Sequence, residues 1–132
     1  MKLTRATSYA LHAVVFMASE DQGQIVASHL IARARGIPER FLLKVLKPLV
    51  SARVLSSVKG PNGGYRLAKS PSQITLLEIM EAVEGPIRGV VPSVEKDVNK
   101  LDPKLEVVCN EIADRVRKQL GKVRITELMG KG

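Results

Sequence analysis

The segment at residues 59–67 constrains the fold of this chain more than any other, and it reads Lys-Gly-Pro-Asn-Gly-Gly-Tyr-Arg-Leu. It joins two short apolar runs, at residues 54–58 and 65–68. Proline presets φ, while asparagine and glycine accept a positive φ at little steric cost, so this segment favours a tight turn. Two extended runs joined by such a turn predict a β-hairpin. The charged residues of the hairpin, Lys59, Arg66 and Lys69, are all basic.

Hydrophobic periodicity predicts three helices before this hairpin, over residues 4–19, 25–35 and 38–51. In the second helix, Leu30, Ile31 and Ala34 are expected to face inward, and Ser28 is a candidate cap. Gly36 is expected to end that helix, because glycine commonly occupies the left-handed position after a helix. The order of helix, helix, short turn, helix and hairpin is that of a winged helix-turn-helix.

The third predicted helix contains a proline in its interior. Its apolar face consists of Phe41, Leu42, Val45, Leu46, Leu49 and Val50. Pro48 interrupts this pattern, because an interior proline removes one hydrogen bond and clashes with the preceding turn, at a cost of roughly 3 kcal/mol or more. We therefore expect a kink or a break near residues 44–47.

Beyond the hairpin, a fourth helix is predicted at residues 76–83, where Thr75 and Glu78 match the capping-box pattern. A proline-containing loop follows at residues 86–103, and then a long amphipathic helix at residues 104–120. The apolar stripe of this helix consists of Leu105, Val108, Ile112, Val116 and Leu120. A single narrow stripe predicts either packing on the same domain or pairing with a second copy, and periodicity favours neither. The short element at 125–129 has no assigned type.

The net charge of +8 lies entirely in the first half of the chain. Residues 1–69 hold 11 Lys and Arg against 3 acidic residues, whereas residues 70–132 hold 10 of each. This asymmetry favours a polyanionic partner for the first half. Because only 3% of the residues are aromatic, a duplex fits better than a single strand, which is bound by aromatic stacking.

The composition also bears on compartment and membrane. No apolar run approaches the roughly 20 residues that a membrane span needs. The chain has a single cysteine, which cannot form an internal disulfide. A cytoplasmic protein with no membrane partner is therefore expected.

In a winged helix-turn-helix, the third helix enters the major groove with its N-terminal residues toward the base edges. Glu39, Arg40 and Lys44 are the candidates for base contacts, since arginine pairs with guanine and glutamate accepts from cytosine. Lys47 lies further along and is expected to contact phosphate, while Lys59 is expected to reach the adjacent minor groove. The other hairpin residues of the predicted DNA-binding set are Asn62, Gly63, Gly64 and Arg66.

No pattern in the sequence indicates catalysis, a metal site or a cofactor. Residues 60–64 lack the terminal Gly-Lys-Ser/Thr of a phosphate-binding P-loop and do not lead into a helix. His12 and His29 have no second ligand at a useful spacing, and Cys109 has no cysteine partner. We interpret Cys109 as a small buried side chain, and we expect that the protein is not an enzyme.

Five motifs, in order along the chain, resemble one family. They are Leu3-Thr4-Arg5-Ala6-Thr7-x-Tyr9-Ala10-Leu11, Gly36-Ile37-Pro38, the hairpin at 59–68, Ile74-Thr75-Leu76 and Ala82-Val83-Glu84-Gly85. This series resembles the Rrf-type (Rrf-two) winged-helix transcription regulators over nearly the whole chain. The resemblance implies a bacterial repressor that binds double-stranded operator DNA as a homodimer.

The resemblance also implies which part of the chain has which function. The winged helix-turn-helix DNA-binding domain would occupy residues 1–85, a loop residues 86–103, and the dimerisation helix with a C-terminal tail residues 104–132. The recognition-helix positions that face bases are matched by Pro38, Arg40 and Lys44. The first-helix positions near phosphate are matched by Thr4, Thr7 and Tyr9. Lys59 matches a position of the hairpin, or wing, that is usually arginine in the family. Lysine keeps the positive charge but lacks the planar guanidinium group of arginine.

The cysteines depart from the family pattern. Sensing members carry three cysteines in the loop before the long helix, whereas residues 86–104 contain none and Cys109 lies within the helix. We therefore expect no iron–sulphur cluster. Four alternatives remain for the signal: a small-molecule effector, a protein effector, the thiol of Cys109, or no signal. The alternative to a DNA-binding regulator is a protein-interaction module on the same fold.

Overall fold

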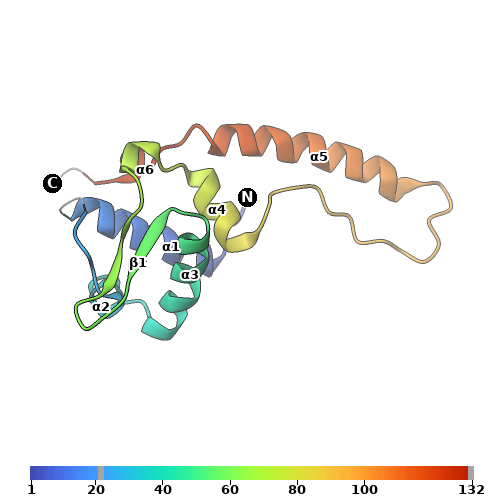
Figure 1. The fold of residues 1–132 in the computed structure, drawn as a ribbon. Coiled ribbons are helices and arrows are strands. Elements are labelled where there is room, and N and C mark those ends of the chain that lie inside the picture. Colours follow the sequence, from blue (N-terminus) through green and yellow to red (C-terminus); the bar gives the residue numbers. More distant parts are fainter. Residues whose placement is uncertain (21–22, 131–132) are drawn as a thin grey trace.

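A computed structural model of the chain describes residues 1–20 and 23–130. Its elements are α1 (Arg5–Ser19), α2 (Ser28–Arg35), α3 (Glu39–Ser51), β1 (Leu55–Val58), β2 (Gly64–Leu67), η1 (Pro71–Gln73), α4 (Leu76–Glu84), α5 (Leu101–Leu120) and α6 (Ile125–Leu128). Helices α1 to α4 and the hairpin form a rounded domain, from which α5 extends with residues 85–100 running beside it (Figure 1). The predicted fold class, mainly α with a β-hairpin and a long C-terminal helix, is confirmed.

The core of the rounded domain lies between α1, α3, α4 and the hairpin. Its large side chains are at most 1% exposed, and they include Val14, Ile31, Leu42, Leu46, Leu49, Val54, Leu55, Ile74, Ile79 and Ile125. Ile125 belongs to this core because the chain returns to the domain after α5. The Ile125 N–H donates to the Ile74 carbonyl at 2.9 Å, and the Leu76 N–H donates to the Val123 carbonyl at 2.9 Å. The C-terminal segment after α5 therefore packs on the rounded domain.

Helix α2 begins at Ser28, three residues later than predicted. Val26 instead exchanges two backbone hydrogen bonds of 2.8 Å with Tyr65 of the hairpin, which holds the chain extended there. Ser28 is the first helical residue and not the cap, which is Ala27. Of the three residues expected to face inward only Ile31 is buried, since Leu30 is 47% exposed and Ala34 is exposed as well.

Helix α3 runs unbroken from Glu39 to Ser51 with Pro48 inside it, so of the predicted kink or break the break is wrong. Its buried side chains are Leu42, Val45, Leu46 and Leu49, which lie before, within and after the segment at 44–47 where the break was predicted. Burial of a leucine or valine stabilises by about 1.5–3 kcal/mol, so the four together outweigh the roughly 3 kcal/mol that an interior proline costs. Phe41 was predicted to face the core but is 41% exposed.

The hairpin is confirmed, with β1 and β2 antiparallel and Leu55 opposite Leu67. Its two adjacent glycines are required by close backbone approaches. A Cβ on Gly63 would lie 2.1 Å from the Val58 carbonyl oxygen, and one on Gly64 would lie 2.4 Å from the Val26 carbonyl oxygen. Gly64 and Tyr65 therefore anchor the hairpin to the segment before α2, whereas Gly63 allows the hairpin turn itself to close.

Helix α4 has the predicted capping box between Thr75 and Glu78. Helix α5 begins at Leu101, three residues earlier than predicted, and Pro103 lies in its first turn. Proline is tolerated there because the first backbone N–H groups of a helix have no intrahelical acceptor. The short closing element is the helix α6. Within the described residues, no helix has the length and apolar character needed to cross a membrane.

Candidate nucleic-acid interface

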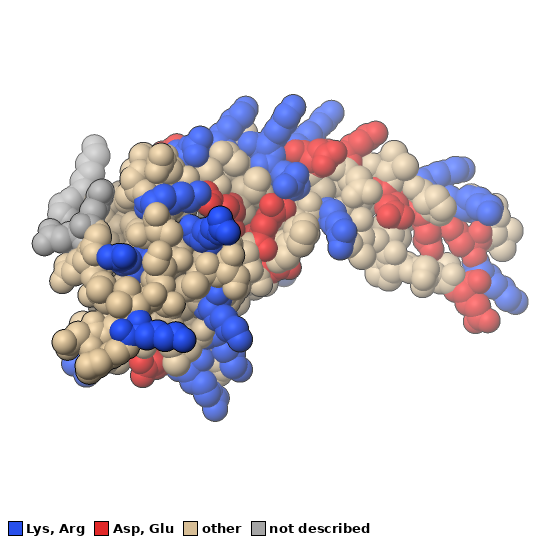
Figure 2. All heavy atoms as spheres, in the orientation of Figure 1, with Lys and Arg blue, Asp and Glu red and all other residues tan. Residues whose placement is uncertain are grey.

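Helix α3 presents a basic face to solvent. Arg40, Lys44 and Lys47 are all exposed and lie opposite the buried leucines of the same helix. Pro38 is the N-cap of α3 and is exposed. Figure 2 shows Lys and Arg side chains projecting from the rounded domain around α3 and the hairpin, with a second group along α5. The three predicted α3 cations therefore share one accessible face.

Phe41 organises two of these cations. The Arg40 guanidinium lies 5.1 Å and the Lys44 amine 5.6 Å from the centroid of the Phe41 ring. Such cation–π contacts hold a charged group over an aromatic face. Phe41 also lines a hollow of about 250 Å³ with Arg5, Ala6, Tyr9, Lys44 and Val45. Tyr9 thus lies half-buried beside the α3 cations, and Arg5 is a further cation at this place that the sequence did not assign to DNA.

Glu39 has a partner inside the helix-turn-helix. The Ser28 hydroxyl donates a hydrogen bond of 2.7 Å to one Glu39 carboxylate oxygen. This contact ties the first turn of α2 to the first turn of α3. Glu39 is exposed and its carboxylate retains further acceptor sites, so it can still accept the base contact that the sequence predicted.

The N-terminus of α1 is bound to the end of α4. The hydroxyl groups of Thr4 and Thr7 both donate to the same carboxylate oxygen of Glu84, and the Thr7 N–H donates to the Thr4 hydroxyl at 3.1 Å. Hydrogen bonds from Thr4 and then Thr7 lower the pKa of Glu84. Thr7 was predicted to lie near phosphate, but its side chain has no exposed surface and is bonded to Glu84. Thr4 and Thr7 thus join α1 to α4, and Thr4 remains exposed.

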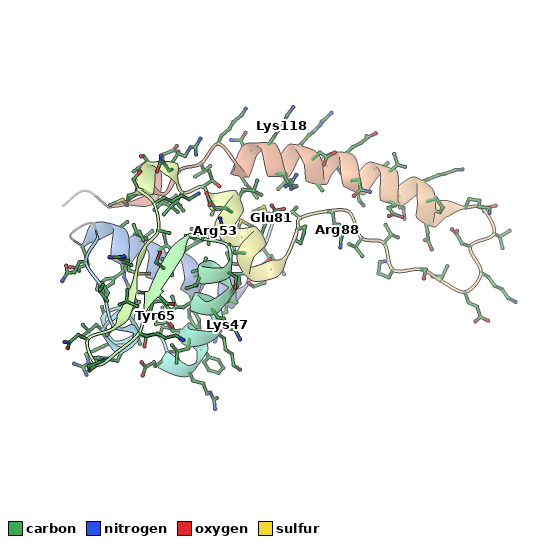
Figure 3. The ribbon with its side chains drawn as sticks, viewed as in Figure 1. Lys47, Arg53, Tyr65, Glu81, Arg88 and Lys118 are labelled. Carbon is green, nitrogen blue, oxygen red and sulfur yellow. The ribbon has the colours of Figure 1, made fainter. Side chains whose placement is uncertain are left out.

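The wing, defined as β1, β2 and the turn between them, exposes Lys59, Asn62 and Arg66. Lys69, just beyond it, lies 2.6 Å from a Glu78 carboxylate oxygen and is therefore paired with an acid. Arg53, between α3 and the wing, is exposed and has a left-handed φ of 63°. Figure 3 labels Arg53 at the end of α3, and it labels Lys47 and Tyr65 on α3 and the hairpin. The turn between α3 and the wing places Arg53 beside both elements, and no pattern in the sequence predicts this position.

The predicted dimerisation stripe is only partly accessible. Leu105, Val108 and Ile112 are 39%, 51% and 56% exposed. Val116 is half-buried, and Leu120 is only 7% exposed because the end of α5 packs on its own domain. Leu120 therefore belongs to the interior of this chain and cannot be part of an open face.

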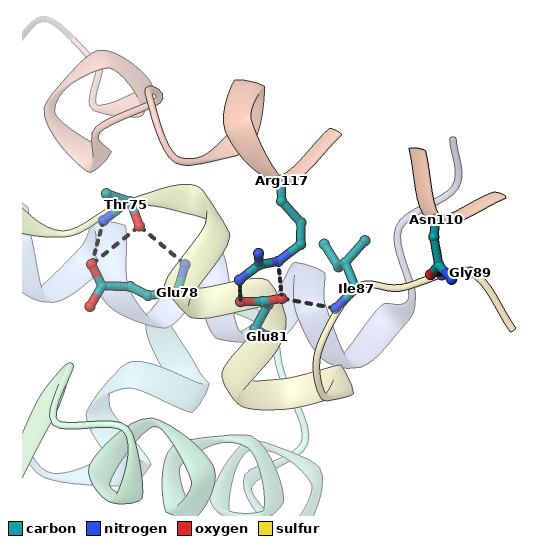
Figure 4. A network of polar contacts seen from close by, with 7 residues as sticks. All are labelled: Thr75, Glu78, Glu81, Ile87, Gly89, Asn110 and Arg117. Atoms are coloured by element: carbon teal, nitrogen blue, oxygen red, sulfur yellow. Dashed lines mark hydrogen bonds and ion pairs between the residues drawn. The ribbon is translucent and has the colours of Figure 1, made fainter. Parts of the chain in front are cut away.

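A polar network fixes α5 to the domain (Figure 4). Arg117 donates to both carboxylate oxygens of Glu81, at 2.9 and 3.2 Å, and the Ile87 N–H donates to one of them at 2.8 Å. The hydrogen bonds from Arg117 are the main cause of the lowered pKa of Glu81. Further along, the Gly89 N–H donates to the Asn110 side-chain oxygen at 2.8 Å. Helix α4, the loop and α5 are thus bound together.

These features define a winged helix-turn-helix protein with a long helical extension. Comparison with known families then places it: residues 3–131 match the model of the Rrf2 family, described as an iron-dependent transcriptional regulator. The chain belongs to the Rrf2 family. The predicted resemblance is confirmed.

Relatives and solved structures agree with this placement. The chain is 34% identical over 129 residues to BadM of Rhodopseudomonas palustris, described as an HTH-type transcriptional regulator, covering 98% of this chain and 81% of BadM. It is also 32% identical to Rv1287 of Mycobacterium tuberculosis over 90 residues. This match covers 68% of this chain but only 56% of Rv1287. The structure of CymR, the global cysteine regulator of B. subtilis, superposes with a TM-score of 0.73 at 26% identity, covering 97% of this chain and 95% of CymR.

The residues present do not fit the iron centre that the family description implies. Iron–sulphur clusters are held mainly by cysteine thiolates, and this chain has one cysteine. The backbone of Gly89 lies against Cys109, so that a Cβ on Gly89 would be 2.6 Å from the Cys109 Cβ. Among residues 1–20 and 23–130, no three His, Cys, Asp or Glu side chains come together in a way that could hold a metal ion.

Proposed function

We propose that this protein is a sequence-specific transcriptional regulator that represses by binding a pseudo-palindromic operator in double-stranded DNA. The observation that carries the proposal is the exposed face of α3, where Arg40, Lys44 and Lys47 lie next to a wing that exposes Lys59 and Arg66. A helix of this kind fits the major groove, and the adjoining wing reaches the backbone or minor groove. Residues 1–85 form the DNA-binding domain in this proposal, and the protein acts in the cytoplasm and performs no catalysis.

We also propose that the protein is a homodimer held together by α5. Leu105, Val108 and Ile112 form the exposed apolar face of this helix. Charge is segregated along the same region: residues 95–114 hold six acidic and three basic residues, whereas residues 115–124 hold five basic and no acidic residues. Antiparallel pairing of two α5 helices places the acidic part of one beside the basic part of the other. Parallel pairing would bring like charges together, which is unfavourable.

The test begins with selection of bound sequences from a pool of random DNA, followed by gel shifts on the selected operator. Lys44→Ala and Lys59→Ala should weaken binding, because each removes a cation from the proposed interface. Lys47→Ala should mainly reduce the slope of affinity against salt, by about one unit for one phosphate contact. Arg88→Ala, which removes an exposed cation outside the charged segment at 95–124, is the control and should leave both affinity and slope unchanged.

The proposal would be contradicted if the affinity for DNA changed neither with salt concentration nor with any of the three interface substitutions. So would a selection that enriches no sequence, because a sequence-specific regulator must discriminate among sites by its contacts with bases.

A further inference from the structure

The exposed face of α3 contains an apolar side chain among its cations. Leu43 is 42% exposed. In a helix with 3.6 residues per turn, it lies one turn after Arg40 and one turn before Lys47, and therefore on the same face as both. Its environment differs from that of Phe41, whose ring is covered by Arg40 and Lys44.

We propose that Leu43 reads the methyl group of a thymine in the operator, an inference that rests on the DNA-binding function proposed above. The cations on either side of Leu43 select a nucleic acid as the ligand of this face. In the major groove, the base edges display hydrogen-bond donors and acceptors, and their apolar group is the C5 methyl of thymine. A leucine there cannot hydrogen-bond to any base, so it favours the base pair that offers a methyl group.

The helix geometry also places this thymine. Arg40 and Leu43 are three residues apart, which is about 4.5 Å along the helix axis at 1.5 Å per residue. Successive base pairs are about 3.4 Å apart. The thymine contacted by Leu43 should therefore lie one or two base-pair steps from the base contacted by Arg40. Each half-site of a symmetric operator should contain one such thymine.

The decisive probe is deoxyuridine, which keeps every hydrogen-bonding group of thymine and lacks only the methyl group. Each thymine of the selected operator is replaced in turn, and affinity for the wild-type protein is measured by fluorescence anisotropy. Affinity should fall roughly fourfold at one position in each half-site, the effect of one fully buried methyl group. The remaining positions should show little change.

Substitution at Leu43 assigns that effect to this side chain. Leu43→Ala should bind the thymine and deoxyuridine operators with equal affinity, whereas Leu43→Met, which keeps an apolar contact, should retain most of the discrimination. Leu128→Ala is the matched control, because Leu128 is a leucine of similar exposure (45%) on α6. It should keep the full roughly fourfold difference.

Three results would overturn the inference, and the third is distinguishable from the first two. If the wild-type protein binds all deoxyuridine operators as tightly as the thymine operator while Arg40→Ala weakens binding, the thymine contact is wrong and the DNA-binding function stands. The same conclusion follows if Leu43→Ala keeps the discrimination. If the wild-type protein selects no DNA sequence at all, the proposed function fails and the thymine contact fails with it.

Discussion

The rounded domain buries most of its large apolar side chains, whereas the arm formed by α5 with residues 85–100 leaves most of its own exposed. In the domain, Leu42, Leu46 and Leu49 have no exposed surface. In the arm, eight large apolar side chains are between 39% and 83% exposed, although Leu120 at the end of α5 is buried. The eight are Val90, Val94, Val98, Leu101, Leu105, Val107, Val108 and Ile112. The domain is complete within one chain, whereas the arm leaves a surface that a second molecule can bury. In the proposed dimer, the domain contacts DNA and the arm contacts the second chain.

Leu46 and Ile112 offer the largest test of this contrast. Leu46→Ala should lower the free energy of unfolding by about 2–5 kcal/mol, the cost of truncating a fully buried leucine, at every protein concentration. Ile112→Ala should lower stability by an amount that depends on protein concentration, because its apolar contacts form only on association. Chemical denaturation at two concentrations separated a hundredfold measures both. If the effect of Ile112→Ala did not depend on protein concentration, the contacts of Ile112 could not be ones that form only on association.

Gly64 tests how the wing is attached to the domain. Gly64→Ala would place a Cβ 2.4 Å from the Val26 carbonyl oxygen, so the two-way hydrogen bonding between Val26 and Tyr65 must be distorted. We expect a loss of about 1–3 kcal/mol in stability, as for other overpacked sites, together with weaker operator binding. Gly130→Ala is the control, because a Cβ there has no atom within 4 Å. Equal melting temperatures for the two variants would argue against the anchoring role.

Glu84 gives the smallest effect and a dependence on pH. Its pKa is lowered by the hydroxyl groups of Thr4 and Thr7, so the carboxylate stabilises the folded state above the ordinary pKa of a glutamate. That contribution is lost as pH falls through the lowered pKa. Glu84→Gln should therefore reduce stability by at most about 1 kcal/mol at pH 7, since the pair is partly solvated, and the difference should shrink in acid. Thermal melts at pH 7 and pH 3 check this, and a difference that grows in acid would contradict it.

Much of this arrangement follows from local sequence signals. The turn at residues 59–67, the capping box of Thr75 and Glu78, and the amphipathic pattern of α5 each predict their element because the physical cause lies within a few residues. The start of α2, the unbroken α3 and the burial of Leu120 could not be predicted in this way. Each depends on contacts between distant segments: Val26 with Tyr65, the α3 leucines with the core, and the end of α5 with its own domain.

The candidate site divides along the same line. The exposed cations of α3 and the wing could be predicted from charge and helical spacing. Thr7 was assigned to phosphate because its motif position says nothing of its burial, and its partner Glu84 lies 77 residues away in the sequence. Arg53 was not considered because its place next to α3 and the hairpin depends on the folded turn. Leu43 was not considered because helical spacing gives its face, whereas its exposure depends on how the domain packs.

The stoichiometry of the protein on its selected operator tests the central contrast most directly. Analytical ultracentrifugation of the wild-type protein with a full operator should show two chains per duplex. The Ile112→Asp variant, which places a charge on the apolar face of α5, should remain folded and bind an isolated half-site as the wild-type domain does. It should lose the cooperative binding of the full operator. A wild-type complex with one chain per operator, or an Ile112→Asp variant that still binds as a pair, would contradict the account.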